Sequence, residues 1–309
     1  MGEPAGEEPA PPGRGTSRAW SALRHDRGAW LGAGLAAAIV LAAVFAPVLS
    51  AHDPQHQYRE LMPSKGGSLG PGGMFLLGTD VPGRDMLARL LHAGRATLII
   101  AISATVIALS IGAAVGLVAG YGGTPKLRFG RRVVGIPVEG TLMRLTDIGL
   151  SFPVLLFAIA LAAVFKPSLE LVIVVIASAL WAGTARLVYA RTLVLRNADF
   201  ITAAHALGTP PGRIIVRHLL PHLLPMLVVL FATGVAVTVL FEVTLTYLGA
   251  GAPAGTLTWG RLLADSVESY SADLRLPLLP GLAIFLTVYA FTLLGDSLRD
   301  ALDPRGWDR

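Results

Sequence analysis

The sequence predicts an all-α integral membrane protein with six transmembrane helices. Hydrophobic residues occupy 53% of the 309 positions and charged residues only 15%, which is too little charge to cover the surface of a soluble domain. Six stretches also reach the length of about 20 mostly apolar residues that a membrane-spanning helix requires. These stretches are roughly Ala29–Leu49, Ala96–Tyr121, Ile136–Phe165, Leu169–Leu187, Leu219–Leu248 and Leu276–Leu294.

The six spans divide the chain into successive regions. Residues 1–28 are rich in proline, glycine and glutamate, so we expect a disordered cytoplasmic tail. The apolar run at 29–49 is longer than the core of a secretory signal, which favours an uncleaved first span. We then expect an extracytoplasmic loop that leads into the second span at 50–95, a core of five helices at 96–298, and a cytoplasmic tail at 299–309.

The basic residues indicate how the spans are oriented. Loop 122–135 contains one lysine and three arginines without an acid, and residues 186–217 contain five arginines against the single acid Asp199. Because positively charged loops stay inside, we expect both segments in the cytoplasm, and six spans then place the N-terminus and the C-terminus there too. Loop 50–95 also carries five basic residues, but long loops follow the charge rule less strictly. These loops explain the net charge of +5, so we expect no nucleic acid partner.

The absence of several residue types and motifs narrows the chemistry. The chain has no cysteine, which excludes disulfides, thiolate metal sites and cysteine nucleophiles. It has no G-x-x-x-x-G-K-[ST] motif and therefore does not cradle nucleotide phosphates by that loop. His52 and His56 are four residues apart, but without a third ligand we interpret them as solvated loop residues. We expect neither a catalytic site nor a metal or cofactor on this chain.

A polar, basic insert at Asp199–Pro225 separates the fourth and fifth spans. Its alanine-rich beginning predicts a helix over Asn197–Leu207, and Gly208 suits the position of positive φ that ends such a helix. A second helix is predicted over Pro210–Leu219, because proline fits a first helical turn and the residue before Pro221 is biased away from helix.

The insert also presents two kinds of surface. Ala203, Ala204 and Gly208 predict a patch with small side chains, which another surface can approach closely. Arg213 and Arg217 are four residues apart and so share a helix face. Such a face pairs equally well with acids of a protein partner or with anionic lipid, and the charge pattern leaves both open.

The insert resembles the signature loop of bacterial ABC importer permeases, E-A-A-x-x-x-G-x(9)-I-x-L-P. Ala203-Ala204, Gly208 and Leu220-Pro221 match its spacing, while Thr202 and His218 replace the acid and the isoleucine. The R-H-L-L-P form is similar to the dipeptide, oligopeptide and nickel subfamily. The resemblance implies that residues 199–221 form the loop that couples to an ATPase subunit, with contacts through Ala203, Ala204, Gly208, Pro210, Arg213, Arg217, Leu220 and Pro221.

Three further segments resemble the second, C-type permease subunit of such importers. They are L-G-T-D-V-P-G-R-D-M-L-A-R-L-L-H-A-G-R at Leu77–Arg95, Y-L-G-A-G with W-G-R-L-L at Tyr247–Leu263, and L-G-D-S-L-R-D-A-L-D-P-R at Leu294–Arg305. The resemblance implies the type I ABC importer permease fold in a bacterial inner membrane. It also implies four kinds of partner: a homologous permease, two ATPase subunits that bind ATP and magnesium, an extracytoplasmic solute-binding protein and the lipid bilayer.

The implied function is import of di- or oligopeptides, with ATP hydrolysis on a separate chain. Nickel or another solute is an alternative cargo within the same class. A different class, the ion-driven secondary carrier, would need ionisable groups at the membrane midplane and often inverted repeats.

Two features inside the spans complete the candidate residues. Gly112, Gly116 and Gly120 form a stripe of small residues on the second span, which predicts close packing on another helix of this chain or of a partner permease. Glu242 lies near the outer end of the fifth span. Intramembrane charge often marks a pathway, so one hypothesis places Glu242 on the outer translocation cavity, facing a peptide amino terminus. The alternative is a carboxyl group satisfied by Thr244, Thr246 or water.

Overall fold

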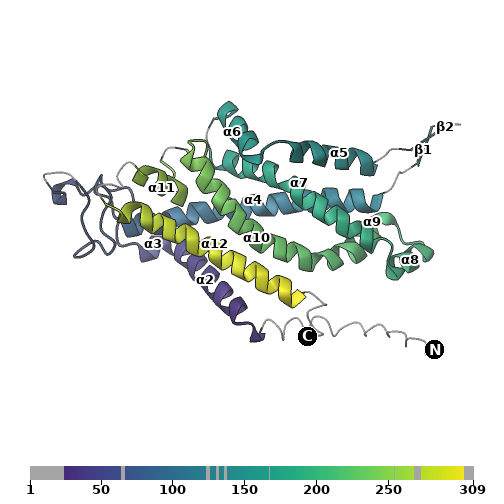
Figure 1. The fold of residues 1–309 in the computed structure, drawn as a ribbon, viewed down its shortest axis with the longest axis horizontal. Helices are drawn as coiled ribbons and strands as arrows, with labels where there is room; N and C mark the ends of the chain where they lie inside the picture. Colours follow the sequence, from purple (N-terminus) through teal and green to yellow (C-terminus); the bar gives the residue numbers. More distant parts are fainter. Residues whose placement is uncertain are drawn as a thin grey trace, which may run out of the picture.

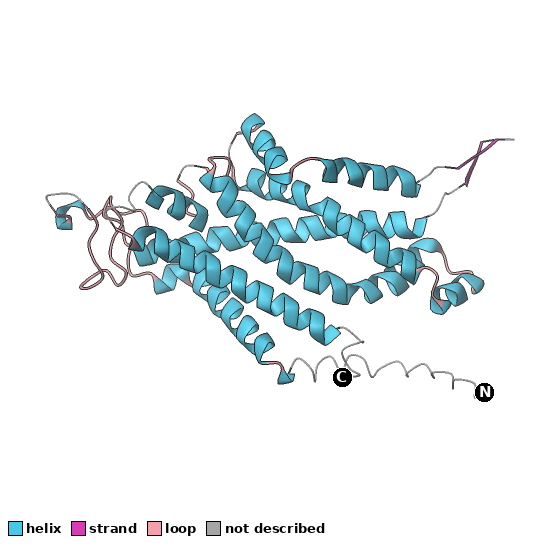
Figure 2. Ribbon diagram, in the orientation of Figure 1, coloured by secondary structure: helices cyan, strands magenta, loops and turns pink. Residues whose placement is uncertain are grey.

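The computed structural model describes residues 24–63, 67–122, 126–129, 132–135, 138–166, 168–253, 255–267 and 273–302. Within them the chain is an elongated bundle of helices, most of which run roughly along its long axis (Figures 1 and 2). Most of the tail predicted at 1–28, and most of the tail predicted at 299–309, lies outside the described residues.

Five helices in the described part of the chain are long and apolar enough to cross a membrane. They correspond to the first, second, fourth, fifth and sixth predicted spans, and they confirm the all-α membrane class. They are α2 (Arg27–Val44), α4 (Met86–Gly122), α7 (Leu169–Leu195), α10 (Leu220–Tyr247) and α12 (Arg275–Leu302). Both α4 and α7 extend beyond the predicted bounds, because polar residues at their ends continue the helix outside the apolar run.

Shorter elements lie between the long helices. Near the first loop these are α3 (Ala46–Leu49) and the 3-10 turn η1 (Arg59–Leu61). The insert contains α8 (Asp199–Ala206), α9 (Pro211–Ile214) and the π-helical segment η2 (Ile215–Leu219), and α11 (Trp259–Val267) precedes α12.

The third predicted span is not a single straight helix. It consists of α5 (Val138–Ser151) and α6 (Val154–Val164), whose axes differ by 87°. Pro153 separates them; proline has no amide hydrogen to continue a helix and disfavours helical geometry at the residue before it. The span predicted at Ile136–Phe165 is therefore bent, and the described residues contain six spans when the bent pair is taken as one.

The basic loop between α4 and α5 contains a small β-hairpin. Strand β1 (Lys126–Phe129) pairs antiparallel with β2 (Arg132–Gly135), and Lys126 lies opposite Gly135. In Figure 1 this hairpin lies toward the same end of the molecule as α8. The prediction of an entirely helical chain thus missed one hairpin, which is formed by a loop and not by the membrane-crossing body.

Three clusters of buried apolar side chains fill the bundle. The first joins α2, α4, α10, α11 and α12, the second joins α4, α6, α7 and α10, and the third joins α4, α7 and the insert to the start of α10. Both α4 and α10 contribute to all three clusters. These two helices therefore form the centre of the bundle, with α12 and α2 on one flank and α5 on the other (Figure 1).

The stripe of small residues on α4 lies against α7. A Cβ atom added at Gly112, Gly116 or Gly120 would approach an atom of α7 to 2.5–2.6 Å, and at Gly116 the nearest atom is the backbone carbonyl oxygen of Ala185. Carbon atoms at ordinary contact lie about 3.5–4.0 Å apart. The backbones of α4 and α7 can approach this closely because the three α4 positions are glycines, which have no side chain.

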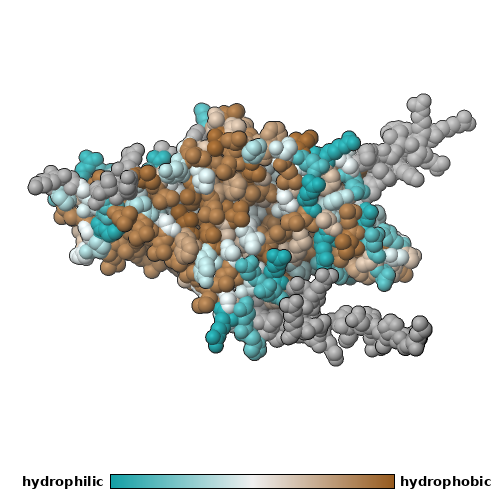
Figure 3. Space-filling view, viewed as in Figure 1, coloured by the Kyte–Doolittle hydropathy of each residue, from teal (hydrophilic) through white to brown (hydrophobic). Residues whose placement is uncertain are grey.

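The surface and the helix ends fit a protein that crosses a bilayer. Hydrophobic side chains cover the middle of the face in Figure 3, and hydrophilic ones gather toward the end that carries α8 and α9. The start of α2 lies beside the end of α12, since a Cβ at Gly28 would meet the side chains of Ser297 and Leu293. Asp26 caps α2 by accepting the backbone N–H groups of Gly28 and Ala29.

We expect Gly116→Ala to destabilise the protein by about 1–3 kcal/mol, since the added methyl group overpacks a contact with backbone atoms that have no rotamer to change. Gly183→Ala on α7 is the matched control, because no atom lies within 4 Å of its Cβ position. Thermal unfolding of the purified variants in detergent measures the difference. Equal midpoints for the two variants would contradict the close α4–α7 contact.

Candidate functional site

The polar insert between α7 and α10 turns at Gly208, directly after α8. The backbone φ angle of Gly208 is +72°, a left-handed conformation that glycine adopts without steric cost. Its chain neighbours aside, no atom lies within 4 Å of the position a Cβ would take. The turn therefore requires glycine for its backbone shape and leaves open space beside it.

The second half of the insert continues without a break into α10. The helix predicted to end near Leu219 instead passes through the π-helical segment η2, where the N–H of Leu220 bonds to the carbonyl oxygen of Ile215. Pro221 lies in the first turn of α10, and Pro225 lies inside the helix. The prediction of a helix end is wrong because the π-helical turn carries the helical backbone past Pro221, although that residue has no N–H to donate.

The structure divides the predicted contact residues between two faces. Ala203, Gly208, Pro210, Arg213, Arg217 and Pro221 are exposed, and Leu220 is partly buried. Ala204 is only 5% exposed and packs in the cluster that includes Ile201 and Leu117. The small-residue patch predicted at Ala203, Ala204 and Gly208 is therefore incomplete, since Ala204 faces the bundle.

The most prominent apolar side chain of the insert is Leu207, which the sequence analysis missed. Leu207 is 85% exposed and lies directly before the Gly208 turn, and Val216 is 64% exposed farther along. A leucine in a short amphipathic helix is ordinarily assigned to the buried face. Its position at the end of α8, beside a positive-φ glycine, is the signal that would have placed it on the outer surface.

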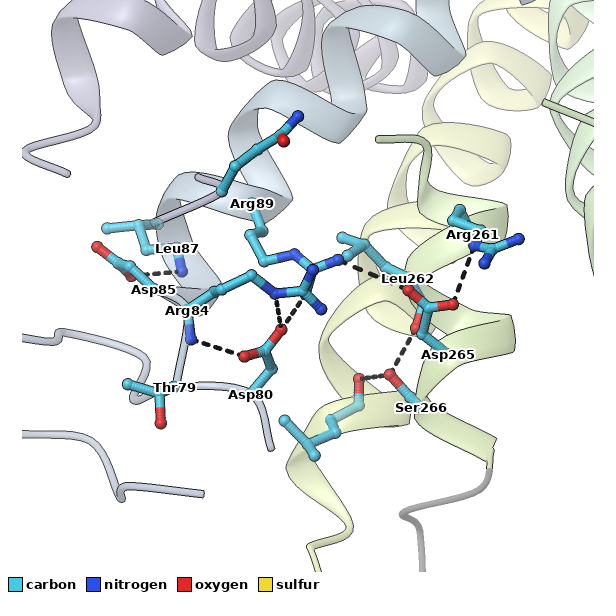
Figure 4. A network of polar contacts seen from close by, with 12 residues as sticks. Thr79, Asp80, Arg84, Asp85, Leu87, Arg89, Arg261, Leu262, Asp265 and Ser266 are labelled. Carbon is cyan, nitrogen blue, oxygen red and sulfur yellow. Dashed lines mark hydrogen bonds and ion pairs between the residues drawn. The ribbon is translucent and has the colours of Figure 1, made fainter. Parts of the chain in front are cut away.

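A polar network occupies the opposite end of the bundle, where the chain enters α4 (Figure 4). Asp80 accepts the backbone N–H and the Nε–H of Arg84, each at 2.7 Å, and it pairs with Arg89. Both Asp80 and Arg89 are buried. Charges taken out of water must be paired to be tolerated, so this pair fixes the loop on the first turn of α4.

The same network reaches α11. Arg89 Nη2 lies 3.7 Å from Asp265 Oδ2, and Arg261 Nε lies 3.0 Å from the other oxygen of Asp265. Beside the network is an open depression of about 540 Å³. Its lining contains charges of both signs, contributed by Asp80, Arg84, Arg89, Arg261 and Asp265.

The segment Leu77–Arg95 thus has a structural explanation. Asp85 accepts the N–H of Leu87 at 2.9 Å, which caps the start of α4, and its other oxygen lies 2.7 Å from His52 Nδ1. Gly78 and Gly83 have φ angles of +79° and +88°, which glycine tolerates best. The acids and glycines of this segment therefore shape a tight loop at the entrance to α4.

Glu242 lies inside the chain and not on a cavity wall. Its side chain is fully buried, and Thr246 donates a hydrogen bond to its Oε1 at 2.9 Å. The hydroxyl groups of Thr97 and Thr258 also face the carboxyl group. Each of these two hydroxyls accepts a backbone N–H from α11, at 3.0 and 3.1 Å, while Glu242 Oε2 has no hydrogen-bond partner within the described residues.

This arrangement corrects the hypothesis that Glu242 lines the outer cavity. The carboxyl group instead joins α10, α4 and the start of α11, and Gly260 allows α11 to approach, since a Cβ there would lie 3.2 Å from Glu242 Oε1. The alternative partner Thr246 is present, whereas Thr244 donates to the carbonyl oxygen of Leu240.

The histidines do not form a metal site within the described residues. There, no group of three or more histidine, cysteine, aspartate or glutamate side chains is arranged to hold a metal ion. His52 bonds to Asp85, and the ring of His56 meets Tyr58 edge to face at 4.5 Å.

In the part of the chain that the structure describes, a bundle of five or six apolar spans with an ordered polar insert at one end is the architecture of a multi-pass membrane protein. The family of binding-protein-dependent transport system inner membrane components matches residues 112–307. The N-terminal transmembrane domain of oligopeptide transport permease C matches residues 16–71. The chain therefore belongs to this family of inner membrane permeases, which confirms the family indicated by the sequence motifs.

Named relatives match over most of their length. The di/tripeptide transport system permease DppC of Pseudomonas aeruginosa is 36% identical over 93% of this chain and 91% of its own. The oligopeptide transport permease OppC of Haemophilus influenzae is 34% identical over 75% and 71%. The glutathione transport permease GsiD of Pectobacterium atrosepticum is 34% identical over 76% and 74%.

A solved structure shares the fold. The inward-facing MetNI methionine ABC transporter superposes with a TM-score of 0.55, covering 70% of this chain and 97% of the matched chain at 21% identity. This likeness confirms the type I ABC importer permease fold.

We expect Asp80→Ala to destabilise the protein by about 3–5 kcal/mol, because it leaves the buried Arg89 guanidinium without its principal partner. The control is Asp147→Ala, which breaks the exposed pair of Asp147 with Arg186 at 2.7 Å and should cost about 1 kcal/mol or less. Thermal unfolding in detergent compares the two. If the Asp80 variant unfolds no earlier than the Asp147 variant, the network does not hold this end of the bundle.

Proposed function

We propose that this chain is the permease subunit that, with a homologous permease, forms the translocation pathway of an ATP-driven importer of di- or oligopeptides. Residues 199–221 dock on an ATPase subunit, and the chain is a transport subunit, not an enzyme. ATP and magnesium bind on two ATPase subunits, and an extracytoplasmic binding protein delivers the peptide.

The exposure of Leu207 is the observation that carries the docking proposal. Leu207 is 85% exposed at the tip of an ordered polar insert. Apolar surface of this kind, surrounded by polar residues, marks a site of protein interaction. Ala203 and the open space at Gly208 let a partner approach, and Arg213 and Arg217 suit acidic side chains at the rim of its groove.

The arrangement of the helix ends supports a cytoplasmic location for the insert. In Figure 1 the basic hairpin lies toward the insert end, and the start of α2 lies beside the end of α12, away from the loop that enters α4. The positive residues of the hairpin and the insert favour the cytoplasm for this end. The N-terminus and the C-terminus then lie there too, and the Asp80–Arg89 network lies on the outer side.

The cargo proposal is based on the relatives. Their names specify di- and tripeptides, oligopeptides and glutathione, all of which contain peptide-like amides with charged ends. With Glu242 enclosed inside the chain, the peptide is selected mainly by the binding protein, and the permease provides a path.

We predict that Gly208→Trp and Leu207→Asp leave membrane insertion intact but abolish peptide uptake, because each blocks the close contact with the ATPase. Gly208→Asn, which tolerates positive φ, and Leu207→Met, which keeps the apolar bulk, are the controls and should retain uptake. Co-purification of the ATPase and uptake of a labelled peptide by proteoliposomes measure the effect. Wild-type uptake by Gly208→Trp at equal abundance would refute the docking role.

The cargo and the energy source are tested in cells that lack this chain. We expect uptake of labelled dipeptide to be lost, to return on complementation, and to be abolished by vanadate, which inhibits transport ATPases. Loss of nickel uptake with normal peptide uptake would instead assign a metal cargo. Uptake that resists vanadate but stops when the proton gradient is collapsed would assign an ion-driven carrier.

A further inference from the structure

Helix α4 differs from α7 and α10 in how it is joined to the insert. The chain itself connects α7 and α10 to the insert, whereas α4 contacts it only through side chains and backbone groups. In the described part of the chain, Tyr121 of α4 bonds to His205 of α8, and Arg196, at the end of α7 just before the insert, donates from Nη1 to the carbonyl oxygen of Gly120 at 3.0 Å. A displacement of α8 therefore reaches α4 across these contacts and the apolar cluster beneath them.

The contact between Tyr121 and His205 is geometrically well defined. The Tyr121 hydroxyl oxygen lies 2.9 Å from His205 Nε2, and the two rings are stacked with planes 6° apart and centroids 5.9 Å apart. His205 Nδ1 lies 3.0 Å from the carbonyl oxygen of Ile201. A carbonyl accepts but does not donate, so Nδ1 carries the hydrogen and Nε2 of the neutral ring accepts the Tyr121 O–H.

Helix α8 is also held by contacts with α10 and with the buried cluster. The ring of Phe200 on α8 stacks on His222 of α10, with centroids 4.6 Å apart and planes 13° apart. Ile201 and Ala204 pack in the buried cluster that includes Leu117 of α4. One aromatic contact, Phe200 with His222, thus ties α8 to α10, and a second, His205 with Tyr121, ties α8 to α4.

We propose that Tyr121 and His205 form a clasp that makes α4 follow the insert during the transport cycle. This inference rests on the proposed docking of the insert on an ATPase. Because α4 is a continuous helix from Met86 to Gly122, movement of its Tyr121 end also shifts its other end. At that end lie Arg89, paired to α11 through Asp265, and Thr97, which faces Glu242. Tyr121 and His205 are in this sense positioning residues for transport, with no contact to cargo or nucleotide.

The ratio of peptide imported to ATP hydrolysed separates this role from simple packing. A residue that only stabilises the fold lowers uptake and hydrolysis together when it is changed, and leaves their ratio unaltered. A residue that links the insert to α4 lowers the ratio, because the ATPase subunits still close but α4 no longer follows. Coupling energies of the usual size correspond to about 5-fold or more.

The variants are His205→Ala and Tyr121→Phe, reconstituted with the partner subunits in proteoliposomes. We expect His205→Ala to lower the ratio about fivefold or more, and Tyr121→Phe, which retains the ring, to lower it less. Asn197→Ala is the control, because it lies outside the docking segment 199–221 and its side-chain amide bonds to the carbonyl oxygen of Leu193 on α7. A wild-type ratio in His205→Ala overturns the clasp.

A chemical cross-link between positions 121 and 205 tests whether restoring the link restores coupling. The chain has no cysteine, so Tyr121→Cys combined with His205→Cys gives a unique pair for a cleavable bis-methanethiosulfonate reagent. We expect a low ratio before cross-linking, recovery toward the wild-type ratio after it, and loss again on cleavage. An importer arrested by the cross-link would show that the two residues must separate, which overturns the proposal. If the wild-type importer itself shows no ATP-dependent uptake, the proposed function fails instead.

Discussion

The close approach of α4 to α7 is the contact on which the rest of the structure depends. Lipid tails are as apolar as leucine, so helices in a bilayer gain little from hiding apolar surface and associate mainly through packing. Gly112, Gly116 and Gly120 provide that packing because they present backbone to backbone. Since α7 leads into the insert and α4 begins at the Asp80–Arg89 network, this one contact joins the two ends of the molecule into one body.

The polar groups buried at the end of the bundle where α4 begins solve a different problem. Asp80 and Arg89 neutralise each other where the loop enters α4. Glu242 Oε1 accepts a hydrogen bond from Thr246, whereas Oε2 has no hydrogen-bond partner within the described residues. The paired charges specify the arrangement of their neighbours, and the half-satisfied carboxyl group costs free energy in this low-dielectric interior. Arg89 pairs with Asp265 of α11, and Gly260 of α11 lies close to Glu242. These contacts fix α11 in position although it is too short to cross the membrane.

The features predictable from sequence are those that depend on nearby residues. Apolar runs determine where five spans lie, and Gly208 marks its own turn because only the local backbone matters there. The break at Pro153 was missed because the apolar composition continues on both sides of it. The burial of Ala204 and of Glu242 depends on side chains of α4, Leu117 and Thr97, which are distant in sequence. The exposure of Leu207 was missed for the converse reason: no described residue covers its side chain.

The two prolines at the start of α10 also indicate where the hydrocarbon layer begins. Neither Pro221 nor Pro225 has an amide hydrogen, so the turn before each loses a hydrogen bond to a backbone carbonyl. Hydrocarbon offers such a carbonyl no replacement, but water and lipid headgroups do. These turns belong to the interface, which leaves Met226–Tyr247 for the apolar interior. At about 1.5 Å per residue that segment measures roughly 33 Å, close to the thickness of about 30 Å that a bilayer core requires.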